Sequence, residues 1–360
     1  MDEEAGSRGV GAEDGRGASG SDQPQSILIR TPNWLGDLLV STAFIQAVLR
    51  YFPRARVDLV VRKGFEILPL PHRGTVLPFD RHATSAGAFG AGLRAAGYSH
   101  FFVLPPSFSA AWMAFRSGVA HRPGYRGQGR GWLLRPALSH RHRPRSVHIG
   151  QEYLDLLAPF LPSTSPPILE DFPAHLELSP EWRETHRPPV PAQGEPYIVL
   201  APGAEYGPAK QWPTRHYAAT ARALAARGWR VVVAGLPQDR PLGDAILAGA
   251  PGGLNLCGDT DLPGMVALVA GASLLISNDS GAMHVGAALG LPQIALFGST
   301  NPHWTAPLNP RAELLTRNEP CAPCYARTCP LKHLNCLEQL EPALVIEKAE
   351  ALLGASPPHS

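Results

Sequence analysis

Short apolar runs rich in branched side chains alternate with helical stretches over most of this sequence. The runs that we interpret as strands are residues 27–30, 57–61, 100–104, 197–201, 230–234, 273–277 and 293–297. The helical stretches are residues 37–51, 214–227, 240–249, 262–271, 281–289 and 338–353. Apolar strands that alternate with helices are typical of parallel sheets buried on both faces. The pattern therefore predicts an α/β fold.

A proline-rich stretch, residues 161–196, interrupts this alternation and indicates a link between two Rossmann-like domains. With 360 residues, 44% of them hydrophobic, the chain is long enough to bury two cores. We predict a first domain, a linker, a second domain and a C-terminal helix at residues 25–175, 176–196, 197–337 and 338–354. Residues 1–24 and 355–360 are poor in large apolar side chains and predict disordered tails.

The sequence shows no targeting signal for a location outside the cytoplasm. It has no uninterrupted run of about 18 apolar residues, so it predicts no transmembrane helix. Residues 1–24 lack the basic and then apolar pattern of a secretory signal. We therefore expect a cytoplasmic protein.

Positive charge is concentrated in one part of the chain. Residues 81–151 contain ten arginines and no lysine, aspartate or glutamate, although the formal net charge of the whole chain is only +2. Codon usage can explain a preference for arginine over lysine, but it does not explain the missing acids. We infer an anionic partner on this side of the protein, for which nucleic acid, a membrane surface and a phosphorylated substrate all fit.

In two-domain folds of this kind, ligands bind at the carboxyl ends of the strands, so the loops that follow strands are the places to search. The first such loop, residues 31–37, ends in Gly36 and Asp37 at the start of a helix. Asp37 is either a plain helix cap or a carboxylate at the mouth of the cleft that can accept a proton. The large loop residues Asn33 and Trp34, which have no capping task, favour the second reading.

The loop after the strand at 197–201 contains Gly203 and one of only four lysines, Lys210. A lysine chosen in an arginine-rich chain indicates a point-charge contact to phosphate. The loop is not a Walker A motif, because the Gly-Lys-Ser/Thr ending is absent.

A third strand leads into Asn278-Asp-Ser-Gly-Ala-Met-His284 and then a helix. Asp279 or Ser280 could simply cap that helix, but two polar residues, Gly281 and His284 exceed what capping requires. We interpret this turn as a diphosphate site, in which backbone N–H groups and the helix dipole face the ligand.

Two further patterns could indicate a metal. Asp259 and Asp261 could pair as hard ligands, but Asp261 precedes Leu-Pro and is better explained as a helix cap. The cysteine cluster lies in one short segment next to His333, and its members are Cys321, Cys324, Cys329 and Cys336. Zinc binding, disulfide pairing and free thiols all remain open for this cluster, although a cytoplasmic location disfavours disulfides.

Four motifs together resemble the ADP-heptose:lipopolysaccharide heptosyltransferases of glycosyltransferase family 9, and within them the type II subgroup. They are residues 32–37, 202–213, 278–284 and 297–308. The resemblance extends from about residue 27 to residue 353. Type I members usually carry a Thr-Thr pair before the lysine, whereas this chain has Gly-Ala-Glu-Tyr, which favours type II. Many type II members also have a similar cysteine-rich segment.

The resemblance implies a GT-B architecture, in which two Rossmann-like domains face each other across a cleft. It implies an inverting, metal-independent transfer of heptose from ADP-heptose to the first heptose of the lipid A–Kdo inner core. No cofactor is expected. The anionic acceptor would bring the protein to the cytoplasmic face of the inner membrane, and we expect no nucleic-acid partner.

The resemblance also implies roles for single residues. Asp37 matches the proposed general base, Lys210 matches the donor-phosphate lysine, and Asp279 matches the carboxylate near the donor heptose. The other donor-binding positions are Gly203, Ser280, Gly281, His284 and, for the ribose, Asp239.

Arg126 and Arg130 lie in a glycine-rich loop of the acid-free stretch, residues 124–132. Each alone could be a solvated surface residue. As a pair, they favour bidentate contacts to the carboxylates or phosphates of the acceptor.

Other functions remain as alternatives. A type I or type III heptosyltransferase, or another GT-B sugar-nucleotide transferase, would use a different acceptor. A nucleotide-sugar epimerase is a further alternative, but this chain lacks a supporting set of histidines and carboxylates in the expected loops. A nucleic-acid-binding protein is another, but this chain lacks aromatic residues interleaved on a recognised module.

Overall fold

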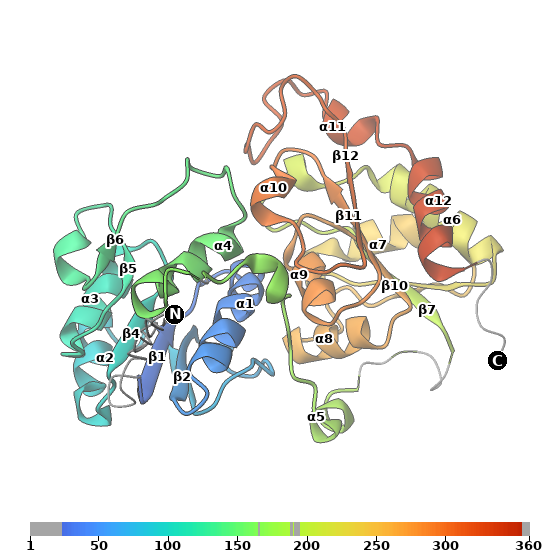
Figure 1. Cartoon of the computed structure of the whole chain (residues 1–360). Coiled ribbons are helices and arrows are strands. Elements are labelled where there is room, and N and C mark those ends of the chain that lie inside the picture. The colour runs from blue at the N-terminus through green and yellow to red at the C-terminus, as the bar shows by residue number, and fades with distance from the viewer. Residues whose placement is uncertain (1–23, 165, 188–189, 191–194, 355–360) are drawn as a thin grey trace, which may run out of the picture.

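The computed structural model describes residues 24–164, 166–187, 190 and 195–354, which form two domains lying side by side (Figure 1). The tails predicted at 1–24 and 355–360 lie outside the described residues, apart from Pro24. No helix in the described part of the chain is long and apolar enough to cross a membrane.

The first domain contains a six-stranded sheet in which every strand pair is parallel. Its order is β3-β2-β1-β4-β5-β6. The strands are β1 (Ser26–Arg30), β2 (Arg56–Arg62), β3 (Val76–Phe79), β4 (His100–Val103), β5 (Gly124–Tyr125) and β6 (Ala137–Leu138).

The second domain repeats this arrangement in the order β12-β11-β10-β7-β8-β9, again with parallel pairs throughout. The strands are β7 (Tyr197–Ala201), β8 (Arg230–Val233), β9 (Leu254–Asn255), β10 (Leu274–Asn278), β11 (Gln293–Phe297) and β12 (Ala312–Thr316). Two doubly wound parallel sheets confirm the predicted α/β class.

Helices connect and cover these strands. In the first domain they are α1 (Leu35–Tyr51), α2 (Ala86–Gly92), α3 (Phe108–Arg116) and α4 (Ile149–Leu154), and α5 (Pro180–Thr185) follows in the connection. In the second domain they are α6 (Thr214–Ala226), α7 (Arg240–Leu247), α8 (Leu262–Ala270), α9 (Gly281–Ala288), α10 (Pro302–Thr305), α11 (Asn335–Glu338) and α12 (Pro342–Leu353).

Both sheets reverse their winding direction at the first strand of the domain. In the first sheet the reversal lies between β1 and β4, and in the second it lies between β7 and β10. Ligands of doubly wound folds bind at such switch points, outside the carboxyl ends of the strands. The loops after β1, β7 and β10 therefore define where the site must form.

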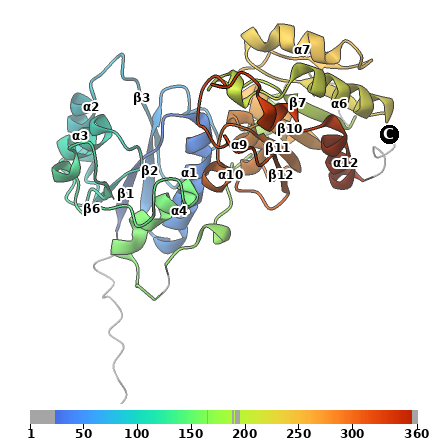
Figure 2. The same cartoon turned by 90° about the horizontal axis from the view of Figure 1, so that it is seen from above.

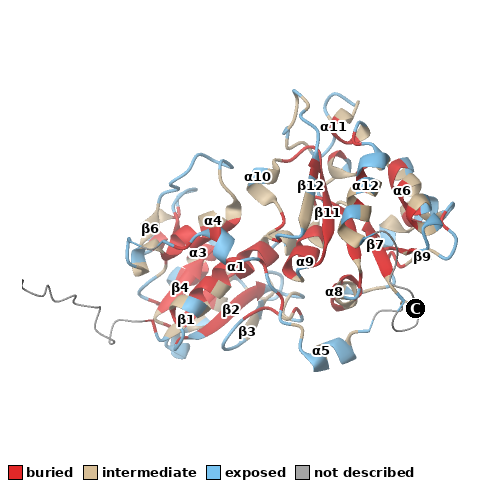
Figure 3. Cartoon of the chain, turned by 45° about the vertical axis from the view of Figure 1, so that its right-hand side comes forward, coloured by how far each residue is buried: buried red, intermediate tan, exposed pale blue. Residues whose placement is uncertain are grey.

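The alternation of side chains along β1 shows how each sheet is covered. Ile27 and Ile29 pack with α1, whereas Leu28 faces the opposite side and packs with α3. One continuous core joins the α1 face of the first sheet to the α8 and α9 face of the second. This burial runs through the junction of the two domains (Figure 3).

The junction holds the domains against each other through α1 and α9, which lie in contact (Figure 2). The chain that connects the domains is anchored to both sides. His175 N donates to Thr42 Oγ1 of α1 at 2.9 Å, and Leu176 N donates to Ala288 O of α9 at 3.0 Å. The exact domain boundaries set out above stay a prediction.

Candidate active site

The loop after β1 is shaped by a buried arginine that sequence reasoning missed. Arg30 ends the strand and is only 3% exposed. Its guanidinium donates to Thr31 O at 2.6 Å and Val60 O at 3.2 Å, and it also bonds the Asn33 side chain. Burial lowers the pKa of Arg30 to about 10, so it keeps its charge. The sequence did contain a signal for this role, namely a charged residue at the end of an otherwise apolar strand.

Asp37 is not the cap of its helix. Trp34 occupies the N-cap position of α1, and Asp37 is the third residue inside the helix. Among the described residues no hydrogen-bond donor satisfies its carboxylate. The structure thus removes the capping alternative and leaves a free carboxylate in the first turn of α1.

The electrostatic surroundings of Asp37 come from both domains. Burial raises the pKa of Asp37 to about 6, Lys210 of the second domain opposes this rise, and Asp279 adds to it. A carboxylate with this pKa is mostly ionised at neutral pH and still basic enough to accept a proton. Two predicted residues of the second domain therefore act electrostatically on a predicted residue of the first.

Lys210 and Asp279 form a buried ion pair within the second domain. Lys210 Nζ lies 2.5 Å from Asp279 Oδ2, and the two side chains are 13% and 5% exposed. Thr300 Oγ1, at the carboxyl end of β11, donates to the same oxygen at 2.6 Å. Thr300 lies in the motif at residues 297–308, whose sequence did not indicate this contact. Asp279 thus fixes the position of the lysine ammonium group.

Asn278 orders the loop that carries Lys210, which is a second contact that the sequence did not reveal. Its side-chain nitrogen donates to Pro202 O at 2.6 Å. Its oxygen accepts from Trp212 N at 3.0 Å and from Tyr217 OH at 3.2 Å. One buried amide at the end of β10 thereby ties down both ends of the loop.

The N-terminus of α9 faces the start of α1. Ser280 is the N-cap of α9 but makes no side-chain capping bond, so the backbone N–H groups of that turn remain available to a ligand. His284 is buried against Gly36, and burial lowers its pKa to about 4, which leaves the ring neutral. His284 thus packs the domain junction beside Asp37.

A cavity of about 230 Å³ opens next to this helix end. It is lined mainly by apolar side chains of the second domain, and its walls include the predicted donor residues Gly203, Asp239, Ser280 and Gly281. A Cβ at Gly203 would lie 2.5 Å from Asp239 Oδ2, so the absence of a side chain at this position gives Asp239 its space beside the loop. An apolar pocket with a carboxylate at its edge suits a nucleoside.

The two predicted acceptor arginines have different environments. Arg126 is exposed and donates to Ala137 O at 2.8 Å. Arg130 is only 3% exposed, and its Nε donates to Tyr125 O at 2.7 Å. Arg130 therefore braces its own loop, which corrects the idea that both guanidinium groups project toward an acceptor.

The candidate metal patterns do not form a ready-made site. Asp261 caps α8 by accepting from Gly264 N at 2.8 Å, as predicted. Cys321, Cys324 and the other two cysteines of the cluster are free thiols around one small cavity. Within the described ranges, no three histidine, cysteine or acidic side chains are grouped so that they could hold a metal ion.

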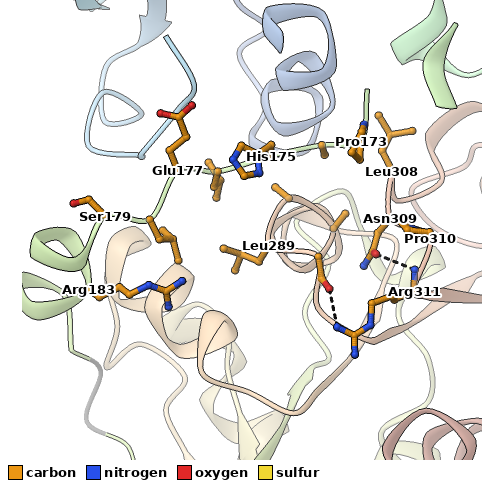
Figure 4. Close-up of a pocket in the computed structure, with 16 residues that line it drawn as sticks. Pro173, His175, Glu177, Ser179, Arg183, Leu289, Leu308, Asn309, Pro310 and Arg311 are labelled. Atoms are coloured by element: carbon orange, nitrogen blue, oxygen red, sulfur yellow. Dashed lines mark hydrogen bonds between the residues drawn. The ribbon is translucent and has the colours of Figure 1, made fainter. Parts of the chain in front are cut away.

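A larger cavity, of about 720 Å³, lies elsewhere (Figure 4). It is bounded by residues 173–179 and 183 of the domain connection, residues 287–290 at the C-terminus of α9, and residues 308–311. The site described above lies at the N-terminus of the same helix. Because this cavity is at the opposite end of α9, away from the strand ends that carry the polar residues, we do not assign the chemistry to it.

Comparison with known proteins gives a consistent family. The model of glycosyltransferase family 9 (heptosyltransferase) matches residues 86–335. Lipopolysaccharide heptosyltransferase 2 of Escherichia coli K12 is 32% identical over 305 residues, which cover 80% of this chain and 87% of that protein.

Solved structures agree with this sequence relationship. E. coli ADP-heptose LPS heptosyltransferase II superposes with a TM-score of 0.76 at 28% identity, covering 91% of this chain and 98% of that chain. An E. coli heptosyltransferase solved with ADP-2-deoxy-2-fluoro heptose shares the fold, with a TM-score of 0.65 at 20% identity over 90% of this chain and all of that chain.

Proposed function

The chain belongs to glycosyltransferase family 9, the heptosyltransferases, and from this premise we propose the reaction that it catalyses. It is a glycosyltransferase of lipopolysaccharide inner-core synthesis that transfers heptose. The donor is ADP-L-glycero-β-D-manno-heptose, and the acceptor is the first heptose of the lipid A–Kdo core.

One observation carries the proposal. A free carboxylate of the first domain, Asp37, has a raised pKa and is coupled electrostatically to a buried lysine–aspartate pair of the second domain, Lys210 and Asp279. An inverting transfer requires a base on the acceptor side and positive charge on the donor side. The two domains supply one each.

In the proposed reaction, Asp37 accepts the proton of the acceptor hydroxyl while the hydroxyl oxygen attacks the anomeric carbon. The new carbon–oxygen bond forms on the face opposite the diphosphate. The bond between the anomeric carbon and the phosphate oxygen breaks at the same time, and ADP leaves with the electron pair. The configuration at the anomeric carbon is therefore inverted.

Lys210 and the N-terminus of α9 stabilise the charge that develops on the leaving diphosphate. Both are fixed before substrate binds, because Asp279 holds the lysine and the strand β10 positions the helix. Preorganised donors of this kind provide much of the stabilisation in enzyme sites. Asp239 and the apolar cavity beside Gly203 hold the nucleoside.

The arginine-rich stretch of the first domain is proposed to hold the anionic acceptor. Lipid A and Kdo carry phosphates and carboxylates, which match exposed guanidinium groups such as Arg126. Contact with the cytoplasmic face of the inner membrane follows from the lipid anchor of this acceptor.

The test is a donor and acceptor panel assayed in EDTA. ADP-heptose, ADP-glucose and UDP-sugars are each combined with lipid A–Kdo, the same core with one heptose, and the same core with two. We expect turnover only with ADP-heptose and the one-heptose core. Preference for the heptose-free core or the two-heptose core would indicate a type I or type III acceptor instead. Turnover that requires added Mg²⁺ or Mn²⁺ would contradict metal independence.

A further inference from the structure

A cationic side chain of the first domain inserts between two aromatic rings of the second. The guanidinium carbon of Arg145 lies 3.9 Å from the ring centroid of Tyr325 and 5.0 Å from that of Trp304. Arg145 belongs to the loop before α4, Trp304 belongs to α10, and Tyr325 belongs to the cysteine-rich segment. Close by, the ring nitrogen Nε2 of His148 contacts Ala306 O at 2.9 Å. These contacts bridge the domains.

Both partners of the closest contact have strained backbones. Arg145 has φ 61° and Tyr325 has φ 53°, in the left-handed region that non-glycine residues rarely adopt. Such residues cost free energy, and they persist where function requires the geometry. Arg145 lies in a turn that Ser146 N closes by donating to Arg143 O at 3.1 Å, and Tyr325 N donates to Ser299 O at 2.7 Å. Backbone hydrogen bonds within each domain thus hold the two conformations that bring the side chains into contact.

The aromatic side of this contact continues to the donor lysine. Tyr206 OH donates to Tyr325 O at 2.6 Å, and Lys210 Nζ lies 4.9 Å from the centroid of the Tyr206 ring. The cysteine-rich segment also accepts a backbone hydrogen bond from the loop that carries Lys210: Ala209 N donates to Arg327 O at 3.0 Å. Contacts therefore extend from Arg145 to Lys210.

We propose that Arg145 is a positioning residue that clamps the two domains together by binding between Tyr325 and Trp304. Closure brings Asp37 of the first domain to the donor site that Lys210 forms in the second. The cysteine-rich segment then has a defined task, since it presents Tyr325 to the clamp and supports the lysine loop. The catalytic consequence rests on the proposed heptosyl transfer, whereas the clamp itself does not.

Glycine variants test the clamp because glycine adopts the left-handed backbone without strain. Arg145→Gly and Tyr325→Gly each delete one side of the contact and leave the backbone geometry available. Arg54→Gly removes the same charge from an exposed turn of the first domain, outside the arginine-rich stretch, and serves as the control. The double variant Arg145→Gly/Tyr325→Gly completes a double-mutant cycle.

We expect Arg145→Gly to lower kcat/KM by about 3- to 30-fold, the range that a cation–π contact can supply. The Kd for ADP should stay unchanged, because the nucleoside cavity lies in the second domain, and the thermal midpoint should not fall. Tyr325→Gly should have the same effects, and the double variant should lose no more kcat/KM than either single variant. The control should retain kcat/KM with ADP-heptose as the varied substrate.

Small-angle scattering separates a failure of the clamp from a failure of the proposed reaction. If the clamp exists, Arg145→Gly and Tyr325→Gly have a larger radius of gyration than the wild type and the control, whatever the substrate is. An unchanged radius of gyration overturns the clamp. Two other results would also contradict the clamp: additive losses of kcat/KM in the double variant, or a lower thermal midpoint with unchanged kcat/KM. Either would show that the contact has only a local structural role.

Discussion

A carboxylate that accepts a proton near neutral pH has to be held where its negative charge is costly. Asp37 is held in this way, since burial and the nearby Asp279 raise its pKa to about 6 while Lys210 limits the rise. The balance depends on both domains, so the basicity of Asp37 is a property of the assembled cleft. Single-residue changes here should therefore separate catalysis from stability.

Replacing Asp37 by Asn removes the base with little change of shape. We expect kcat to fall by about 10²- to 10⁴-fold, the usual contribution of general base catalysis. The wild-type kcat/KM should rise with pH through about 6 and then level off, because only the ionised carboxylate accepts a proton. The profile of initial rates between pH 5 and pH 8 checks this, and a variant with near-normal kcat would exclude Asp37 as the base.

The same substitution should stabilise the protein at neutral pH. The pKa of Asp37 is higher in the folded state, so the folded state binds more protons between about pH 4 and pH 6 and loses stability as pH rises through that window. The asparagine side chain avoids this cost. We expect Asp37→Asn to raise the free energy of unfolding by about 1–3 kcal/mol at pH 8 and by almost nothing at pH 4. Urea unfolding at both values measures the difference, and a gain that is equal at both would rule out ionisation as its cause.

Lys210 and Asp279 depend on each other for stability. Lys210→Met leaves a buried carboxylate that retains only the Thr300 hydroxyl, and we expect a loss of about 3–5 kcal/mol in the free energy of unfolding. Calorimetry should also show weaker binding of ADP. The double variant Lys210→Met/Asp279→Asn should recover most of the stability but not the binding, and a double variant as unstable as the single one would contradict the pairing.

At the scale of elements, the site depends on how closely the first turns of α1 and α9 approach. Gly36 provides the space, because a Cβ there would lie 2.7 Å from His284 Cδ2. The missing side chain thus lets one helix start beside the other. The position of Asp37, one residue later, is determined by this packing.

Gly36→Ala should therefore be destabilising, although alanine has a higher helix propensity than glycine. We expect a loss of about 1–3 kcal/mol from overpacking, with a larger loss in kcat/KM than in ADP affinity. Gly92→Ala is the matched control, because Gly92 ends helix α2 and a Cβ there would meet no atom within 4 Å. If both variants have the same thermal midpoint and the same kcat/KM, the close approach of α1 and α9 contributes neither to stability nor to catalysis.

The elements that sequence reasoning identified are those whose pattern is long and apolar. The strands at 197–201 and 293–297 were predicted with the bounds that the structure shows, because all five residues of each are buried. Two strands of the first sheet were missed for different reasons: the edge strand β3 contains a proline, and the inner strand β5 has only two residues, one of them glycine. Their pairing depends on a neighbouring strand far away in sequence, which no local pattern encodes.

For the site, the loops at the strand ends predicted Asp37, Lys210 and Asp279, and the roles of these residues stay predictions. Their contacts were not predictable, since the Lys210–Asp279 pair joins residues from two loops and Asn278 ties those loops together through backbone groups. The burial of Arg130 was equally hidden, because a glycine-rich loop sequence does not indicate which arginine turns inward.

At the scale of the whole molecule, the first domain carries the excess of positive charge and the second carries the donor site. Residues 81–151 have ten arginines and no acidic residue, yet Arg122 and Arg130 use their guanidinium groups to bind backbone carbonyls of their own domain. Charge composition alone therefore overstates how much of the stretch faces a ligand. The acceptor surface should comprise the exposed arginines only.

Arg126 and Arg130 separate these two roles within one loop. Arg126→Gln should raise KM for the lipid acceptor and weaken its dependence on salt, because an exposed cation attracts phosphates and carboxylates through a screened interaction. Arg130→Gln should instead lower the thermal midpoint, because it removes a buried hydrogen bond to Tyr125 O. The Kd for ADP-heptose should stay the same in the Arg126 variant. Steady-state rates over a range of salt concentrations, together with thermal unfolding, test both variants. An acceptor KM and salt dependence that do not change in Arg126→Gln would show that this loop does not hold the acceptor.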